Sequence, residues 1–150
     1  MTIRLRAAEE KDWPAILEQA DAALPWDASG NREWLENRKA FGGRRRHYVA
    51  EEVSSGAVVG YGNIEEGPDP GNYRIYVVTE PALLEGEVGT FLFERLVSDL
   101  RELEATGAWV REYSRDRATV AFFAERGFEE RDRFTLPEHE EMVVLVWREM

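Results

Sequence analysis

The stretch from Tyr73 to Leu103 restricts the fold of this chain most strongly, because it places a strand, a glycine-bearing loop and a helix in direct succession. Its first seven residues, Tyr73–Thr79, are rich in β-branched and aromatic side chains, which predicts one buried strand. Pro81 ends that strand, since proline has no N–H for a ladder hydrogen bond. Such a unit directs free backbone N–H groups and the positive end of a helix towards the loop, where they can bind an anion. Apolar residues at helical spacing predict the helix over about four turns, at Val88, Phe91, Leu92, Leu96, Leu100 and Leu103.

Composition indicates a single domain, residues 1–150, with a hydrophobic core. Apolar residues make up 43% of the chain, which excludes a disordered protein. Cysteine is absent, so disulfides, thiolate metal sites and a cysteine nucleophile are excluded. No apolar signal segment or membrane-spanning run is present, and we expect a soluble cytoplasmic protein with no membrane partner. The net charge of −11 argues against nucleic acid as a partner, because its phosphates would be repelled, and is compatible with cationic substrates.

Strand and helix patterns alternate along the chain. Asp12 can cap the first helix, which has Pro14 in its first turn, and Asp116 can cap the last one. The order β-α-α-β-β-β-α-β-α-β-β predicts an α/β protein with a mixed sheet flanked by helices. Besides the central unit, we predict strands over residues 3–7, 47–53, 57–65, 108–113, 128–136 and 141–147, and helices from residue 12, over 29–41 and over 116–126.

Nearly the whole chain resembles the GNAT-type N-acetyltransferases. The order of elements is that of the family, including two helices between the first two strands. Thr79-Glu80-Pro81, followed by eight residues to Gly89, matches the length of the family's acetyl-CoA loop, in which a proline precedes an Arg/Gln-x-x-Gly-x-Gly/Ala segment. The segment RATVAFFAERGFEE is similar to the family's later helix, which ends in Gly-Phe, here Gly127-Phe128, and leads into the next strand.

The resemblance implies the GNAT fold, a mostly antiparallel sheet of about six to seven strands flanked by about four helices. Tyr73–Thr79 would lie at its centre and splay from the parallel strand over residues 108–113, which opens a cleft for the pantetheine arm. Acetyl-CoA would be the co-substrate and an amine the acceptor, and a homodimer is compatible with this fold. The oxyanion would be held by the N–H of Val77 or Val78. The residues that would contact the cofactor are Val77, Val78, Thr79, Leu84, Gly86, Val88, Gly89, Thr90, Asp116 and Phe123.

The loop departs from the family pattern at three positions. Leu84 takes the place of the family's Arg/Gln, Glu87 that of its first glycine, and Glu85 another position that is often glycine. Unit charges about 4 Å apart interact by ~4 kcal/mol at a surface-like dielectric, whereas a helix N-terminus contributes only ~0.3–1 kcal/mol to an exposed anion. Carboxylates facing the concave side of the loop would therefore weaken cofactor binding, and carboxylates facing solvent would lower the affinity less. Acidic residues in a first turn also complement the helix dipole, and Gly86 supplies a permissive backbone.

The proton donor of the family is also replaced. Phe123 aligns with the tyrosine that protonates the departing CoA thiolate in many members, and phenylalanine has no proton to give. Asp116 aligns with an asparagine near the pantetheine arm. Tyr113 and Ser114 are the nearest substitutes for the tyrosine, although an aromatic residue at the end of a strand is the more common explanation of Tyr113. A thiol has a pKa of ~8.5, so unassisted departure slows the transfer without forbidding it.

On the acceptor side, a general base must take the proton of the amine. Glu65 and Glu66 at the end of the third strand are the candidates, with Tyr73 on the facing strand as a substrate contact; a solvated pair at a turn explains both glutamates equally well. Trp26, in a loop, is the candidate for an apolar substrate pocket. No metal site is expected, because His47 and His139 have no partners at metal-like spacing.

Two functions follow from these observations. The first is N-acetylation, by acetyl-CoA, of a primary amine of a small molecule or a peptide. The alternative is a degenerate GNAT domain that serves as a ligand-binding or interaction module without efficient acyl transfer. The loop from Leu84 to Gly89 discriminates between them, because it decides whether acetyl-CoA binds.

Overall fold

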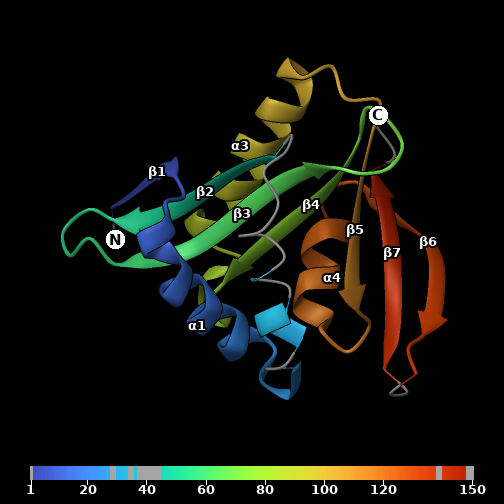
Figure 1. Ribbon diagram of the computed structural model, residues 1–150, viewed down its shortest axis with the longest axis horizontal. Helices are drawn as coiled ribbons and strands as arrows, with labels where there is room; N and C mark the ends of the chain where they lie inside the picture. Colours follow the sequence, from blue (N-terminus) through green and yellow to red (C-terminus); the bar gives the residue numbers. More distant parts are fainter. Residues whose placement is uncertain (1, 28–29, 34–35, 37–44, 138–139, 148–150) are drawn as a thin grey trace.

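The computed structural model describes residues 2–27, 30–33, 36, 45–137 and 140–147 (Figure 1). Residues 30–33 and 36 are helical, and the rest of the helix predicted over residues 29–41 lies outside the described residues. The strands are β1 (Ile3–Ala7), β2 (Arg45–Glu52), β3 (Val58–Glu66), β4 (Asn72–Thr79), β5 (Gly107–Tyr113), β6 (Phe128–Thr135) and β7 (Glu141–Trp147). The helices are α1 (Trp13–Ala23), α3 (Glu87–Glu102) and α4 (Arg117–Ala124), with short 3-10 helices η1 (Glu10–Asp12), η2 (Pro25–Asp27) and η3 (Pro81–Leu83).

The seven strands form one mixed sheet in the order β1-β2-β3-β4-β5-β7-β6. The predicted central position of Tyr73–Thr79 is confirmed, because β4 has three strands on either side. All neighbouring strands are antiparallel except β4 and β5, which are parallel. These two pair only at their starts, from Asn72 with Gly107 to Arg74 with Trp109, and then diverge, as Figure 1 shows. The predicted splay is therefore confirmed.

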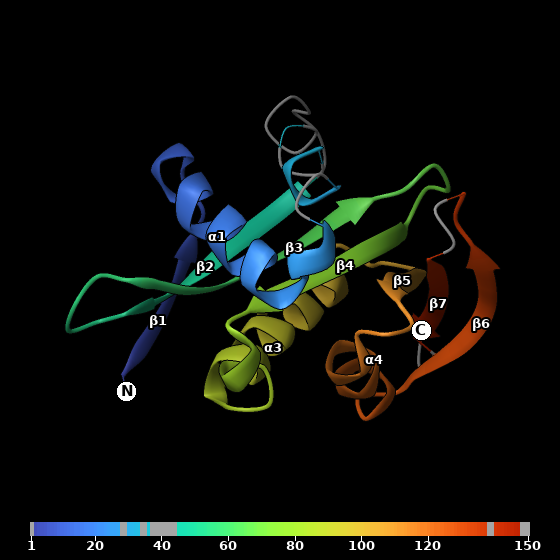
Figure 2. The ribbon, with the colours of Figure 1, turned by 90° about the horizontal axis from the view of Figure 1, so that it is seen from below.

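Helices cover both faces of the sheet, with α1 on one face and α3 and α4 on the other (Figure 2). The larger core lies under α3, where Leu92 and Leu96 are fully buried with Ile75 of β4. The smaller core lies under α1, where Ile16 packs with Val78. Burial of each such side chain contributes about 1.5–3 kcal/mol. Because β4 packs against helices on both sides, its sequence is a nearly continuous apolar run.

Two predicted helix caps have different outcomes. Asp12 precedes α1 without capping it, because its two carboxylate oxygens each bind the Arg6 guanidinium at 2.8 Å and one also accepts the Glu9 N–H at 2.8 Å. A bidentate ion pair is stronger than a single hydrogen bond to a helix N–H. Asp116 does cap α4, since its carboxylate accepts the Thr119 N–H at 3.3 Å. That helix ends at Ala124, earlier than predicted.

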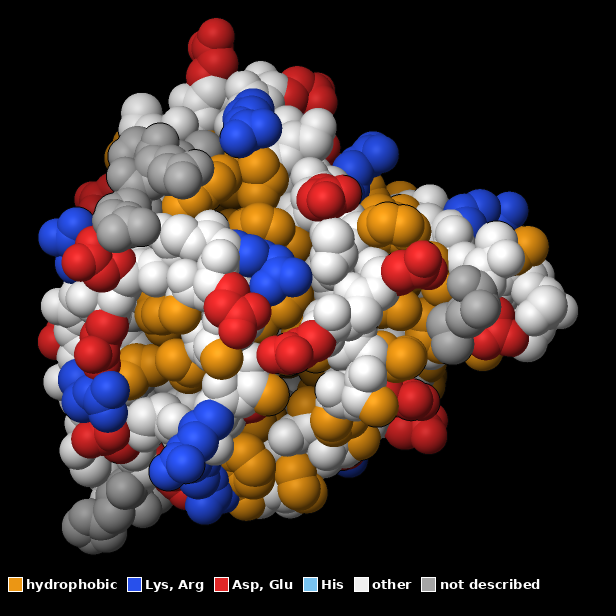
Figure 3. Space-filling model, turned by 180° about the vertical axis from the view of Figure 1, so that it is seen from behind, with side chains coloured by type: hydrophobic (Ala, Val, Ile, Leu, Met, Phe, Trp, Pro, Cys, Tyr) orange, Lys and Arg blue, Asp and Glu red, His pale blue; other side chains and the backbone are white. Residues whose placement is uncertain are grey.

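The surface carries charges of both signs. In the view from behind, acidic and basic side chains are interspersed with apolar ones (Figure 3). Within the described part of the chain, no helix has the length and apolar character needed to cross a membrane. The same residues contain no group of three or more His, Asp or Glu side chains that could hold a metal ion.

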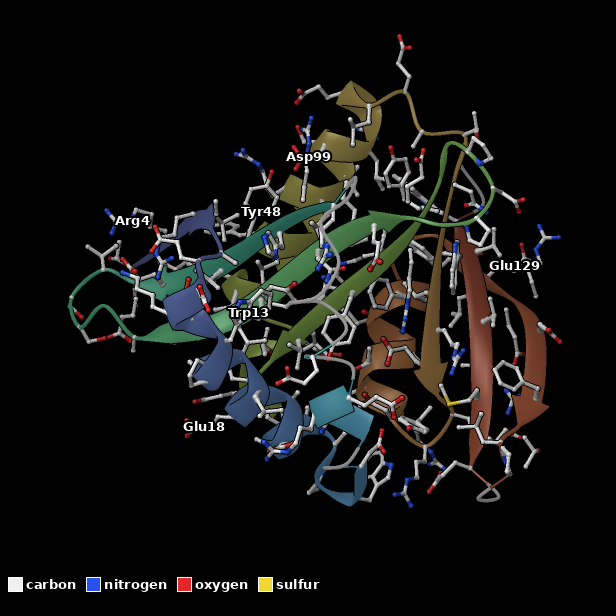
Figure 4. The ribbon with its side chains drawn as sticks, viewed as in Figure 1. Arg4, Trp13, Glu18, Tyr48, Asp99 and Glu129 are labelled. Atoms are coloured by element: carbon white, nitrogen blue, oxygen red, sulfur yellow. The ribbon has the colours of Figure 1, made fainter. Side chains whose placement is uncertain are left out.

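A buried carboxylate attaches α3 to the sheet (Figure 4). Asp99 on α3 is 2% exposed and accepts a hydrogen bond from the Tyr48 hydroxyl on β2. Its oxygen also lies 3.4 Å from a guanidinium nitrogen of Arg46 and 3.7 Å from one of Arg95. Burial and then the bond to Asp99 raise the pKa of Tyr48, so the phenol remains a donor at neutral pH.

We predict that Asp99→Ala lowers the free energy of unfolding by about 1.5–3 kcal/mol, the range for a hydrogen bond to a charged group. The Tyr48 hydroxyl would lose its acceptor in a partly buried position. Urea denaturation measures the loss. Glu102→Ala is the matched control, because Glu102 lies on the same helix and contacts Arg46 at 3.3 Å from an exposed position. An equal loss in the two variants would contradict this account.

Candidate functional site

A cleft opens where β4 and β5 separate. Its walls come from the end of α1, from β4 and the loop that follows it, from β5 and from α4. It contains five of the residues predicted to contact a cofactor: Val77, Val78, Thr79, Leu84 and Asp116. The other lining residues are Ala23, Leu24, Tyr76, Pro81, Glu112, Ala118 and Thr119.

One wall of the cleft is an open strand edge. β4 pairs with β3 along its length, from Tyr73 to Thr79, but with β5 only as far as Arg74. In a strand of this kind, half of the backbone groups point away from the paired neighbour. Between Ile75 and Thr79, those groups face the cleft and can bond an extended ligand.

The loop after β4 is fixed by close packing against α3. A Cβ atom on Gly89 would lie 1.8 Å from the Leu84 carbonyl oxygen, so only glycine fits there. The Leu84 side chain is buried and lines the cleft. The Gly86 N–H donates to the Leu83 carbonyl at 3.3 Å and turns the chain into the helix. The loop therefore presents its backbone to the cleft, together with the apolar side chain of Leu84.

The first turn of α3 combines exposed carboxylates with free N–H groups. Glu85 and Glu87 are exposed, whereas Val88, predicted to contact the cofactor, is buried in the core. Gly86 is the N-cap and provides no side-chain acceptor, so the first N–H groups of the helix have no partner in it. At this turn the Arg126 guanidinium donates to the Thr90 hydroxyl at 3.4 Å. The turn is therefore bordered by charges of both signs.

The cleft also holds a buried carboxyl group that was not predicted as a site residue. Glu112 is 6% exposed and lines the cleft. Burial, and secondly the charge of Asp116, raise the pKa of Glu112 to about 8, against the opposing effect of Arg74. The sequence contained a signal, because Ala108 and Val110 alternate with exposed or half-buried residues along β5 and place Glu112 on the buried side.

Comparison with known proteins identifies the architecture. No protein-family model matches the sequence, and no curated protein matches it. Solved structures do match. A GNAT-family protein from Desulfovibrio desulfuricans superposes with a TM-score of 0.75 at 17% identity, over 97% of this chain and 98% of that one. The chain has the GNAT fold.

Two further GNAT-like structures cover the chain as completely. A ribosomal-protein-alanine N-acetyltransferase from Brucella melitensis gives a TM-score of 0.72 at 24% identity, over 95% of this chain and 98% of that one. A protein from Salmonella typhimurium, solved with its cofactor acetyl-CoA, gives a TM-score of 0.71 at 21% identity, over 97% of this chain and 93% of that one. At these identities the likeness establishes the fold.

Phe123, which the resemblance predicts at the place of the family's tyrosine, lies in the core. It is fully buried, and its ring packs edge-on against Phe93, Phe122 and Phe128. It is not among the residues that line the cleft, whereas Thr119, one turn earlier on α4, is. The aligned position therefore holds an apolar packing residue.

Trp26 and Tyr113, predicted on opposite sides of the reaction, lie together. Their ring centroids are 6.1 Å apart, and the Arg115 guanidinium lies 3.8 Å above the Trp26 ring. The Tyr113 hydroxyl donates to the Asp27 carboxylate. Burial and then Asp27 raise the pKa of Tyr113 above its usual range, so the phenol stays neutral. This contact joins η2 to the end of β5.

The predicted residues on the acceptor side, Glu65, Glu66 and Tyr73, lie near the end of the sheet where β4 and β5 are still paired. Glu65 faces Arg74 and Glu66 faces Tyr73 in the β3–β4 ladder, and none of the three residues lines the cleft. Glu66 accepts the Gly71 N–H at 3.0 Å and closes the turn between the strands. Tyr73 is buried in the larger core. Glu65 shares a face of β3 with Tyr61, which packs under α1.

We predict that Glu112 makes stability depend on pH. The folded carboxyl keeps its proton up to about pH 8, because its pKa is raised there from the 4.5 of a free glutamate. The folded state therefore binds the extra proton between these values, and stability falls as pH rises through this window. Relative to Glu112→Gln, the wild type should lose up to ~1.4 kcal/mol per pH unit there. Urea denaturation of both proteins between about pH 5 and pH 9 measures the difference; parallel curves would contradict the buried, protonated state.

Proposed function

We propose that this protein is an N-acetyltransferase that transfers the acetyl group of acetyl-CoA to a primary amine of a small molecule or a peptide. The observation that carries the proposal is the parting of β4 and β5 after Arg74 and Trp109, with a cleft lined by both strands and by α4. An open strand edge beside a cleft can take an extended, amide-bearing chain such as pantetheine by backbone hydrogen bonds. The GNAT fold of the chain is consistent with this use of the cleft.

The residues of the cleft fit the parts of the co-substrate. Acetyl-CoA supplies the thioester, and the chain supplies the surfaces that hold it. Val77 and Val78 would bond the pantetheine amides and the carbonyl oxygen of the acetyl group through their backbone. Leu84 and Ala118 provide apolar walls. The free N–H groups at the start of α3, with Gly86 at the N-cap, would hold the phosphates.

The acceptor would approach from the α1 side. Ala23 and Leu24 at the end of α1 line the cleft. Trp26 follows them in η2, and its ring contacts that of Tyr113 at the end of β5. The net charge of −11 favours the approach of a cationic amine. Glu65, on the α1 face of β3, is the proposed general base and would take the amine proton through water, because it does not line the cleft.

A ligand-binding module without efficient transfer is the second candidate function. The specific observation in its favour is the loop, in which a buried leucine replaces the family's Arg/Gln and two exposed carboxylates border the helix start. Both features lower the affinity for a pyrophosphate. The two candidates differ in turnover, not in fold.

One experiment separates these functions. Saturating acetyl-CoA at 100 times its dissociation constant should stabilise the fold by about 2.7 kcal/mol, which a thermal-shift titration detects. Release of free thiol should then follow addition of a primary amine, with polyamines, amino acids and peptides that begin with alanine as the panel. Binding with no thiol release would favour the module, and no binding at any concentration would contradict the transferase.

We predict that Glu85 and Glu87 weaken acetyl-CoA binding. The double change Glu85→Gln/Glu87→Gln should lower the dissociation constant by roughly 2- to 30-fold, if each exposed pair is worth ~0.2–1 kcal/mol. The gain should shrink at high salt, because exposed charges are screened within ~8–10 Å. Isothermal titration calorimetry at two salt concentrations measures it.

The control for this prediction removes two charges from the other part of the helix. Glu94→Gln/Glu104→Gln changes the net charge equally, at exposed positions along and just after α3. An equal gain in the control would show a general charge effect. An unchanged dissociation constant in the Glu85/Glu87 variant would show that both carboxylates point away from the phosphates.

A further inference from the structure

We propose that Glu112 is the general acid of the reaction, the group that protonates the sulfur atom as the thiol leaves. The inference rests on the proposed function. It assigns a catalytic role to a residue outside the positions that the GNAT resemblance marks.

The position of Glu112 carries the proposal. Glu112, near the end of β5, lines the cleft together with Leu84, Asp116 and Thr119. It is almost completely buried, and the causes of its raised pKa are burial and the nearby charges of Asp116 and Arg74. A carboxyl group that is almost completely removed from solvent loses most of its hydration, so its place in a ligand cleft calls for a functional explanation.

The groups around Glu112 keep its proton in place. Asp116 at the start of α4 is negative, Arg74 on β4 is positive, and Tyr76 of β4 lines the same cleft. The residue opposite on β7 is the apolar Val143. Burial and Asp116 outweigh Arg74 and raise the pKa of Glu112 to about 8. This value is close to the ~8.5 of a thiol, so the carboxyl is protonated at neutral pH and well matched to the leaving sulfur.

The other candidate donors are placed less favourably. Phe123 has no proton and is packed in the core. The Tyr113 hydroxyl already donates to Asp27. Thr119 lines the cleft, but an alcohol is a far weaker acid than a carboxylic acid. Glu112 therefore combines access to the cleft with an available proton.

The proposed step balances without a further reactant. The amine nitrogen forms a bond to the thioester carbonyl carbon, the carbon–sulfur bond breaks, and its electron pair goes to sulfur. Glu112 gives its proton to that sulfur, which leaves as a thiol. The nitrogen that becomes the amide loses one proton to Glu65 through water, Glu65 passes it on to solvent, and Glu112 regains one from solvent. The net change is amine plus thioester to amide plus thiol.

The test compares Glu112→Gln with Glu129→Gln, an exposed position on β6 (Figure 4). Glutamine keeps the shape of the side chain but cannot give up a proton, so kcat should fall by about 10²-fold or more. The wild-type kcat should decline above about pH 8, where Glu112 ionises, and the variant should lack this decline. The dissociation constant for acetyl-CoA should stay unchanged, and Glu129→Gln should keep wild-type kcat. In the ligand-free protein, carboxyl NMR should show one group titrating near pH 8 that Glu112→Gln removes.

The outcomes separate the two proposals. Wild-type protein that binds no acetyl-CoA and transfers nothing overturns the proposed function, and the general acid with it. Transfer that persists at the same rate and with the same alkaline decline in Glu112→Gln overturns the general acid alone. A loss of acetyl-CoA affinity with unchanged kcat also overturns it, because Glu112 would then only position the ligand.

Asp116→Asn provides a second variant that does not depend on the folding of Glu112→Gln. Asparagine can still cap α4, but it removes the negative charge that helps to hold the proton on Glu112. The alkaline decline of kcat should move to lower pH. A decline that stays at the wild-type position would overturn the assignment.

Discussion

The incomplete pairing of two parallel strands determines the rest of this structure. β4 and β5 share hydrogen bonds over only three residue pairs, so the sheet is closed at one end and open at the other. The open end exposes backbone groups that a sheet normally satisfies internally. Apolar side chains of α1, the loop and α4 surround these groups. The same geometry thus creates a binding edge and the low-dielectric space beside it.

That low dielectric gives the site its electrostatic character. Glu112 lies at the open end of the β4–β5 pair and is almost completely buried, with the apolar Leu84 and Ala118 lining the same cleft. Its proton is retained because the charged form has lost its water. Tyr113, one residue further along β5, experiences a related shift but has Asp27 as a partner. Glu112 therefore keeps its proton mainly because it is buried, whereas the adjacent Tyr113 keeps its proton through burial and a hydrogen bond to Asp27.

The fold was largely accessible from the sequence, and the site only in part. Periodicity identified β4 and α3 because both bury regular apolar faces, and it placed the splay correctly. Contacts between distant residues could not be predicted, as the 86-residue separation of Tyr113 and Asp27 illustrates. Asp12 failed as a cap because the bidentate ion pair with Arg6 on β1 occupies its carboxylate. Glu112 was not predicted as a site residue because it lies outside the motif positions that the resemblance aligns. Only the alternating burial of β5 indicates its place on the buried side of that strand.

The strand order has a consequence for biosynthesis. β7 is inserted between β5 and β6 although it follows both in the chain, so the strand that supports one wall of the cleft leaves the ribosome after the other six strands of the sheet. Until it arrives, β5 has only its short contact with β4 and the wall carrying Glu112 is unsupported. Long-range strand insertion of this kind is slow compared with helix formation. A nascent chain therefore gains its cleft in a late, single event, and ligand binding would report the completion of folding.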